Sequence, residues 1–175
     1  MKNFFELYDL PVSFSPDPAI VKKQYYALSK KYHPDFYANQ SAEIQEEVLQ
    51  LSTENTKAYQ TFSDKKRLIE YVLQLLGAIK EEEHYNLPQD FLIEMMEINE
   101  KLMDLQFDPN VEELQKVKSL ISKFEAGLND ELNLHTNDFD VVDEDHKQVK
   151  LSKIKDLYYR SKYLARLNET LTKMG

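Results

Sequence analysis

The stretch that decides the fold covers residues 17–35 and is DPAIVKKQYYALSKKYHPD. Asp17 followed by Pro18 predicts the start of a helix, with the aspartate as N-cap and the proline in the first helical position. Apolar side chains then recur every three or four residues, which indicates a helix with one buried face. Pro34 lacks an N–H and disfavours the helical conformation at His33, so the helix has to end there. The stretch therefore predicts an amphipathic helix that leads into a turn presenting an imidazole and a carboxylate.

A second amphipathic pattern follows after a short loop, over 41–62, and predicts a helix antiparallel to the first. Asn55 interrupts its apolar face, and because a buried amide needs partners we expect it to bond to backbone across the hairpin. Asp64 then opens a shorter helix that Gly77 ends. Together with a brief helix over 4–8, this part of the chain is expected to form an antiparallel helical hairpin with short flanking helices.

The remaining sequence has three more helical patterns and no convincing strand. They cover roughly 88–106, 109–134 and 145–173, with Asp108 and Pro109 opening the second. The segment 135–146 between the last two is acidic and aperiodic, which predicts a mobile loop. The expected all-α chain thus comprises a helical unit over 1–76, a linker over 77–87 and an antiparallel three-helix bundle over 88–175.

Composition excludes several classes of function. The 175 residues include no Cys and only three Gly, so disulfides, thiolate metal sites, Cys nucleophiles and glycine-rich phosphate loops are not expected. The net charge of −9 disfavours nucleic-acid binding. The four His are scattered along the sequence, so we expect no catalytic residues, no metal site and no cofactor. No apolar run is long enough for a signal peptide or a membrane span, which favours a cytoplasmic protein that binds no membrane.

The Tyr-His-Pro-Asp turn at 32–35 and its surroundings resemble the J-domain family. The helix before the turn carries Lys22, Lys23, Lys30 and Lys31, and the elements follow in that family's order. The resemblance implies docking on a DnaK/HscA-type chaperone and stimulation of its ATP hydrolysis. It assigns chaperone binding to His33, Pro34, Asp35, Lys22, Lys23, Lys30 and Lys31. The residues alone leave an alternative open, in which His33 merely ends a helix and the lysines form an ordinary solvated face.

The first helix of the predicted bundle has more apolar residues than one buried face needs. At about 100° per residue, its core face consists of Phe91, Met95, Ile98, Leu102 and Leu105. A second stripe lies roughly 100–140° away and consists of Leu92, Met96 and Met103, bordered by Ile93, Glu97, Glu100 and Asp104. Adaptable Met side chains beside charges are typical of a protein-binding surface. The alternative is that this stripe widens the bundle core or packs against the N-terminal unit.

The whole chain resembles the HscB family, the J-domain co-chaperones of iron–sulfur cluster assembly. The landmarks are Phe4-Phe5-Glu6-Leu7 with Leu10-Pro11, the His33-Pro34-Asp35 turn, and Phe91-Leu92-Ile93-Glu94 leading to Glu97. The resemblance implies that the bundle binds an IscU-type iron–sulfur scaffold. It assigns scaffold contact to Leu92, Ile93, Met96, Glu97, Glu100, Asp104 and Tyr159. On the last helix, Tyr159 and Tyr163 point away from the seam of Leu157 and Leu164, where they could join this surface.

These features predict an adaptor rather than an enzyme. One surface would engage the chaperone while the other delivers the scaffold, which promotes cluster transfer. Each contact is expected to be modest and transient, in a chain that is a monomer or a weak oligomer. Three alternatives remain: a general J-domain co-chaperone with another client, an enzyme whose carboxylates are assembled in space, and a plain structural bundle.

Overall fold

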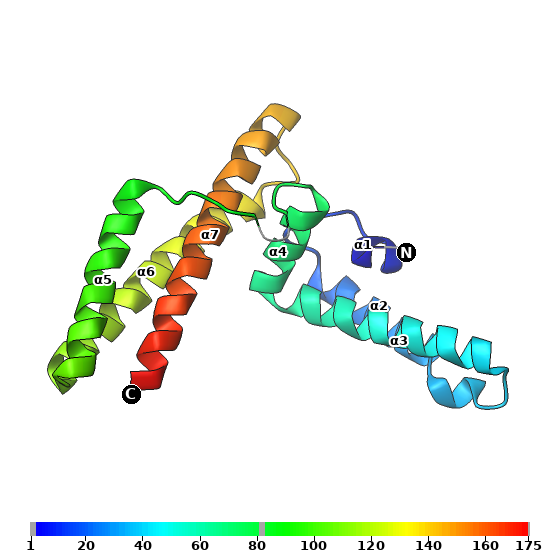
Figure 1. Cartoon of the computed structure of the whole chain (residues 1–175). Helices are drawn as coiled ribbons and strands as arrows, with labels where there is room; N and C mark the ends of the chain where they lie inside the picture. The colour runs from blue at the N-terminus through cyan, green and yellow to red at the C-terminus, as the bar shows by residue number, and fades with distance from the viewer. Residues whose placement is uncertain (1–2, 81–82, 175) are drawn as a thin grey trace. The chain divides into compact units, whose positions relative to one another are not determined.

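The computed structural model describes residues 3–80 and 83–174, and every regular element in that part of the chain is helical (Figure 1). The all-α expectation is therefore confirmed. The chain divides into two compact units, one up to Leu76 and one from Gly77 on. Within the expected linker over 77–87, residues 81 and 82 lie outside the described residues. The helices are α1 (Phe4–Leu7), α2 (Pro18–Lys31), the 3₁₀ helix η1 (Pro34–Tyr37), α3 (Ala42–Ser63), α4 (Lys65–Leu75), α5 (Gln89–Phe107), α6 (Val111–Asn137) and α7 (Glu144–Met174).

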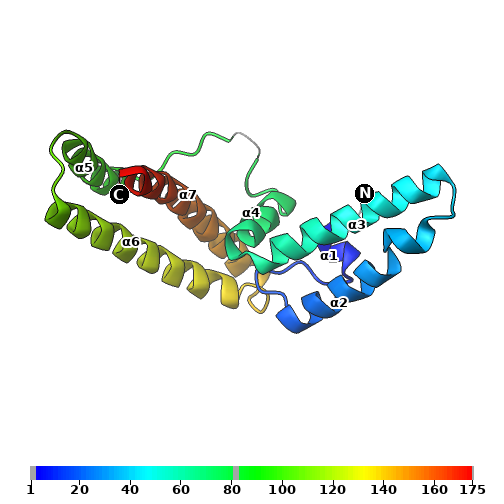
Figure 2. The same ribbon diagram turned by 90° about the horizontal axis from the view of Figure 1, so that it is seen from below.

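The N-terminal unit is built on α2 and α3, which lie side by side and run in opposite directions (Figures 1 and 2). The Asp17 side chain accepts a hydrogen bond of 2.8 Å from the amide two residues on, and Pro18 takes the first helical position, as the sequence predicts. One cluster of buried residues in this unit consists of Tyr8, which follows α1, Val21 of α2 and Ala58 of α3. Half-buried apolar side chains surround them, namely Phe4, Leu7, Leu10, Tyr25, Leu28, Tyr59 and Phe62. Removal of this apolar surface from water holds the hairpin closed.

Asn55 is the buried polar residue of the hairpin and joins three segments. Its Nδ2 donates to the Tyr25 carbonyl (3.1 Å) and to Ser29 Oγ (3.0 Å), both on α2. Its Oδ1 accepts a hydrogen bond of 2.9 Å from the hydroxyl of Tyr8, which follows α1. The predicted bond to backbone across the hairpin is confirmed, and two side-chain bonds complete the amide's set of partners.

The short helix α4 begins and ends as its sequence predicts. The Asp64 carboxylate caps it by accepting hydrogen bonds of 2.9 and 3.1 Å from the second and third amides that follow. Gly77 lies just beyond the helix at φ +68°, in the left-handed region that favours glycine. Tyr71 of α4 holds α1 in place, because its ring stacks on Phe4 at 4.7 Å and its hydroxyl accepts a hydrogen bond of 2.8 Å from the Phe4 amide.

The C-terminal unit is a bundle in which each of α5, α6 and α7 packs on the other two, with α6 running opposite to its neighbours (Figure 1). The buried residues of α5 are the five that helical spacing predicts, Phe91, Met95, Ile98, Leu102 and Leu105. The other helices contribute Val117, Ile121, Leu128, Leu132, Ile154, Leu157, Leu164, Leu167 and Leu171. One face of each helix therefore forms the core of the bundle.

The start of α6 differs from the sequence prediction. The helix begins at Val111 rather than at Pro109, because Asn110 is its N-cap. The Asn110 Oδ1 accepts hydrogen bonds from the amides of Glu112 (2.9 Å) and Glu113 (3.1 Å). Because the Asn110 side chain satisfies two free backbone amides, the N-cap is Asn110 and not Asp108, two residues earlier, as the sequence predicts.

The long mobile loop predicted over 135–146 is wrong in extent. Helix α6 continues to Asn137 and α7 begins at Glu144, so only a short turn separates them. Thr136 and Phe139 are buried, and the Thr136 hydroxyl donates a hydrogen bond of 2.7 Å to the carbonyl four residues before it. The burial of these two side chains orders a segment whose acidic composition favours disorder.

Candidate functional site

The turn between α2 and α3 has the geometry that Pro34 predicts. Helix α2 ends at Lys31, and His33 is extended (φ −72°, ψ 124°) just before the proline opens η1. The His33 Nδ1 accepts a hydrogen bond from the Asp35 amide (3.3 Å), and the His33 carbonyl accepts one from the Phe36 amide (3.1 Å). The imidazole thus caps a short helix, so the turn is set by backbone contacts as well as by the proline.

His33 and Asp35, here called the dyad, both face solvent. The His33 side chain is 52% exposed and the Asp35 side chain 86%, and His33 Nδ1 lies 3.7 Å from Asp35 Oδ2. Because Nδ1 is turned toward Asp35, Nε2 is the ring nitrogen that a partner can reach. An exposed carboxylate on a fixed turn can accept two hydrogen bonds from an arginine side chain.

The basic face of α2 consists of Lys22, Lys23, Lys30 and Lys31, and all four side chains are exposed. Within residues 3–80 and 83–174, none of them forms an ion pair with a carboxylate. The Lys31 ammonium lies 5.1 Å from the centre of the Tyr32 ring. The face therefore keeps its positive charge available for an acidic partner surface.

Two exposed aromatic side chains that were not predicted from the sequence, Tyr26 and Phe36, lie beside these residues. Tyr26 is one helical turn from both Lys22 and Lys30, and more than half of it is exposed. Phe36 is also more than half exposed, and its ring centre lies 5.6 Å from that of His33. The spacing of four residues from the lysines is a signal that would have found Tyr26. The exposure of Phe36 follows from the 3₁₀ turn, which spacing does not reveal.

Six of the residues assigned to the scaffold lie together on α5. Ile93 is 53% exposed, and Met96 and Met103 of the second stripe are 58% and 51% exposed, so these residues do not widen the bundle core. Leu92 is half-buried at the edge of the core. The acids next to them, Glu97, Glu100 and Asp104, are exposed and form no ion pair with a described residue. An exposed apolar surface with an unneutralised acidic border results.

Tyr159, the seventh of these residues, is half-buried on α7. Its ring stacks on Tyr85 with centres 4.5 Å apart, and its hydroxyl donates a hydrogen bond of 3.2 Å to Glu83 Oε2. The expectation that Tyr163 points away from the core is corrected. Its ring packs edge-on against the core residue Phe91 with centres 6.0 Å apart, because α5 begins beside this part of α7.

The segment before α5 is tied to α7 by a polar cluster, here called the strap cluster, made of Glu83, Tyr85, Lys155, Asp156 and Tyr159. The Lys155 ammonium donates to Glu83 Oε1 (2.7 Å), and the Tyr85 hydroxyl donates to Asp156 Oδ1 (2.8 Å). The hydrogen bond from Lys155 is the main cause that lowers the pKa of Glu83. Burial, followed by the bond to Asp156, raises the pKa of Tyr85 to about 12. The strap cluster could not be predicted from the sequence, because its partners lie some seventy residues apart.

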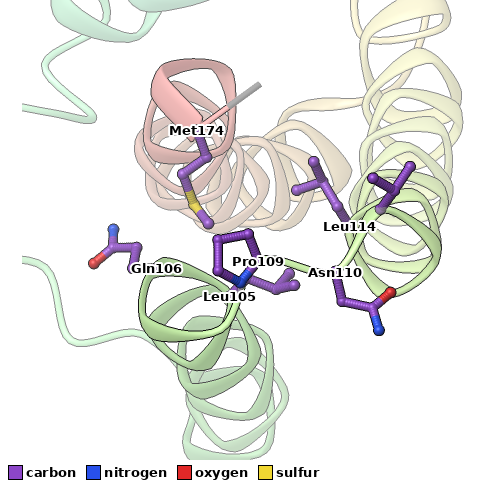
Figure 3. A pocket seen from close by; sticks show the side chains of 7 residues that line it. Leu105, Gln106, Pro109, Asn110, Leu114 and Met174 are labelled. Atoms are coloured by element: carbon purple, nitrogen blue, oxygen red, sulfur yellow. The ribbon is translucent and has the colours of Figure 1, made fainter.

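The end of the bundle where α5 meets α6 contains an open hollow of about 410 Å³ (Figure 3). Its lining is mostly apolar and carries no charged side chain, and consists of Leu105, Gln106, Pro109, Asn110, Val111, Leu114 and Met174. Over the described ranges, no three His, Cys, Asp or Glu side chains are grouped so that they could hold a metal ion. Nor is any helix there long and apolar enough to cross a membrane.

Comparison with known proteins identifies the family. A family model described as the HSCB C-terminal oligomerisation domain matches residues 87–172. A co-chaperone protein HscB homolog of Psychromonas ingrahamii is 34% identical over 139 residues, which are 74% of this chain and 82% of that protein. The chain belongs to the HscB co-chaperone family. HscB relatives are co-chaperones rather than enzymes, which agrees with the expectation from the sequence.

Other HscB proteins extend this result to the fold. The HscB homolog of Vibrio cholerae is 38% identical over 101 residues, 57% of this chain, and the match spans only 59% of that relative's length. The solved structure of chaperone HscB from Vibrio cholerae superposes with a TM-score of 0.70 at 26% identity, over 98% of this chain and 96% of its own. The crystal structure of human co-chaperone protein HscB superposes with a TM-score of 0.74 at 25% identity, over 98% of this chain and 81% of the human chain. These matches confirm the expected J domain followed by a helical bundle.

Proposed function

We propose that this chain is a co-chaperone that delivers an IscU-type iron–sulfur scaffold to a DnaK/HscA-type chaperone, stimulates the chaperone's ATP hydrolysis and so promotes cluster transfer. Two exposed surfaces support the proposal, the dyad with the basic face of α2 and the outer face of α5. Membership of the HscB family supports the co-chaperone role. We place this activity in the cytoplasm, in a monomer or weak oligomer without a resident cofactor.

The observation that carries the proposal is the exposed dyad on its fixed turn. The Asp35 carboxylate can capture an arginine of the chaperone by a charge-assisted, bidentate hydrogen bond. If that arginine is accessible only in the ATP-hydrolysing conformation of the chaperone, the dyad binds this conformation preferentially. Binding then shifts the chaperone's conformational equilibrium toward it. The lysines of α2 would speed the encounter with an acidic chaperone surface. The chain itself supplies no catalytic group to the hydrolysis.

The exposed face of α5 supports the second contact. Ile93 and Met96 would leave water when a scaffold docks on them, and methionine adapts its shape to an irregular surface. Glu97, Glu100 and Asp104 would then face basic groups of the scaffold at the border of the contact. Neither surface needs to bind tightly, because one chain that holds both partners raises the concentration of the scaffold at the chaperone.

A stimulated ATPase assay with the full chain tests the chaperone contact. We expect the wild-type chain to stimulate a DnaK/HscA-type chaperone, and to stimulate it further when scaffold is added. His33→Gln should abolish stimulation, whereas the matched change His84→Gln, at another exposed histidine, should leave it unchanged. Undiminished stimulation by His33→Gln at saturating concentration would contradict this contact.

Calorimetry with metal-free scaffold tests the second contact. The double change Leu92→Ala and Met96→Ala should weaken scaffold binding and leave ATPase stimulation without scaffold intact. The matched pair Leu134→Ala and Val149→Ala, at exposed apolar residues of α6 and α7, should alter neither. A chain that stimulates the chaperone and binds no scaffold would instead be a general J-domain co-chaperone with another client.

A further inference from the structure

The apolar side chains exposed on α5 continue beyond the residues assigned to the scaffold. Met103 is 51% exposed and Phe107, the last residue of α5, is 85% exposed. We propose that the scaffold-binding surface extends to the end of α5, where Met103 and Phe107 contact the same partner. This inference rests on the proposed function and adds two binding residues to it.

Helical geometry places the four exposed apolar residues in one band. At about 100° per residue, Ile93, Met96, Met103 and Phe107 fall within roughly 80° of one another, on the side of α5 opposite its buried face. With a rise of about 1.5 Å per residue, the band is roughly 21 Å long. The apolar residues already assigned to the scaffold, from Leu92 to Met96, span only about 6 Å by the same measure. The added residues therefore extend the apolar part of the contact, which covers one helical turn, along the stretch that the assigned acids Glu97, Glu100 and Asp104 already border.

The exposure of Phe107 has no structural explanation within the unit that contains it. Its ring makes no contact with another aromatic ring among the described residues, and 85% of the residue meets solvent. Core packing therefore does not require a phenylalanine at this position. A large aromatic side chain left in water at the end of a binding face is the kind of residue that anchors a protein contact.

The charges beside the band indicate the chemistry of its partner. At about 100° per residue, Glu100 falls within the band, between Phe107 and Ile93, and Asp104 lies at its edge. Neither acid forms an ion pair with a residue that the structure describes. The band therefore fits an elongated apolar strip edged by Lys or Arg. If a second copy of this chain docked here, the carboxylates of the two copies would face and repel each other. This repulsion favours the scaffold as the partner that binds the band.

Calorimetric titration of the full chain with metal-free IscU-type scaffold tests the extension. We expect Met103→Ser with Phe107→Ser to raise the Kd at least about fivefold, as for loss of anchoring apolar contacts. Ile93→Ser with Met96→Ser is the reference for the proposed site, and Leu134→Ser with Val149→Ser is the matched control. All six residues are exposed, so circular dichroism and Tm should not change.

The outcomes separate this inference from the proposed function. A wild-type chain that binds no scaffold would overturn both. A Kd that rises with Ile93→Ser and Met96→Ser but not with Met103→Ser and Phe107→Ser would overturn the extension alone. The extension would also be overturned if analytical ultracentrifugation showed that Met103→Ser with Phe107→Ser dissociates a dimer while scaffold affinity stays the same. The band would then contact a second copy of this chain.

Discussion

The rings of Tyr85 and Tyr159 lie stacked, with centres 4.5 Å apart and planes within 7° of parallel. Tyr85 belongs to the segment before α5 and Tyr159 to the middle of α7, so the pair joins two parts of the bundle that are distant in the sequence. Their hydroxyls donate to different carboxylates, that of Asp156 for Tyr85 and that of Glu83 for Tyr159. The position of the Tyr159 side chain therefore depends on its contacts with Tyr85 and Glu83 in the strap cluster.

Tyr85→Ala is expected to destabilise the bundle by about 2–3 kcal/mol, because it removes a stacked pair and a hydrogen bond to a carboxylate. Tyr85→Phe keeps the stack and should cost only about 1 kcal/mol, since Asp156 retains its bond to Arg160 at 2.6 Å. Urea titration of the full chain followed by circular dichroism measures both. Equal losses for the two variants would show that stacking contributes nothing.

Glu83→Gln is expected to reduce stability at neutral pH and to have less effect in acid. The pKa of Glu83 is lowered from 4.5 in the folded chain, so its contribution is present above that value and is lost as the pH falls through the folded pKa. The Tm difference between variant and wild type should therefore be largest near neutral pH and shrink below about pH 4.5. Glu94→Gln, at an exposed acid of α5, is the control. A difference that stays constant with pH would contradict a charge contribution from Glu83.

Asn55→Ala is expected to destabilise the N-terminal unit by about 2–3 kcal/mol. The change leaves the Tyr25 carbonyl and Ser29 hydroxyl without the amide that they contact, and it opens a small cavity. The Tyr8 hydroxyl keeps its hydrogen bond of 3.1 Å to the backbone carbonyl of residue 55, which limits the loss of stability. The shift in urea midpoint measures the effect, with exposed Asn39→Ala as control. An unchanged midpoint would mean that water replaces the amide without cost.

Lys30→Glu with Lys31→Glu is expected to raise the concentration of co-chaperone that gives half-maximal ATPase stimulation, on the order of tenfold at low salt. The effect should shrink in high salt, because ions screen exposed charges. Lys57→Glu with Lys66→Glu changes the net charge equally at exposed positions outside the basic face. If both pairs of changes act alike, the net charge of the chain matters and the face itself does not.

Much of the fold could be predicted because its determinants are local. Apolar spacing on α5 identified all five of its buried residues, and Asp17, Asp64 and Gly77 lie at the helix ends that they predicted. Periodicity reports which face of a helix is buried, and capping depends on atoms only a few residues apart. The start of α6 was less predictable, since Asp108 and Asn110 are both good caps and only the structure shows that Asn110 accepts the hydrogen bonds of the first free amides.

The candidate surfaces divide in the same way. The sequence by itself determined the dyad and the acidic, apolar face of α5, because a proline turn and a helical face are set by neighbours along the chain. Only the tertiary structure decided that Asn55 bonds to Tyr8, that Tyr159 stacks on Tyr85, and that burial of Thr136 and Phe139 orders the turn after α6. Such contacts join residues on different elements, and they form only where helix packing brings two side chains within reach. The spacing of residues along one helix does not predict the distance between side chains on two different helices.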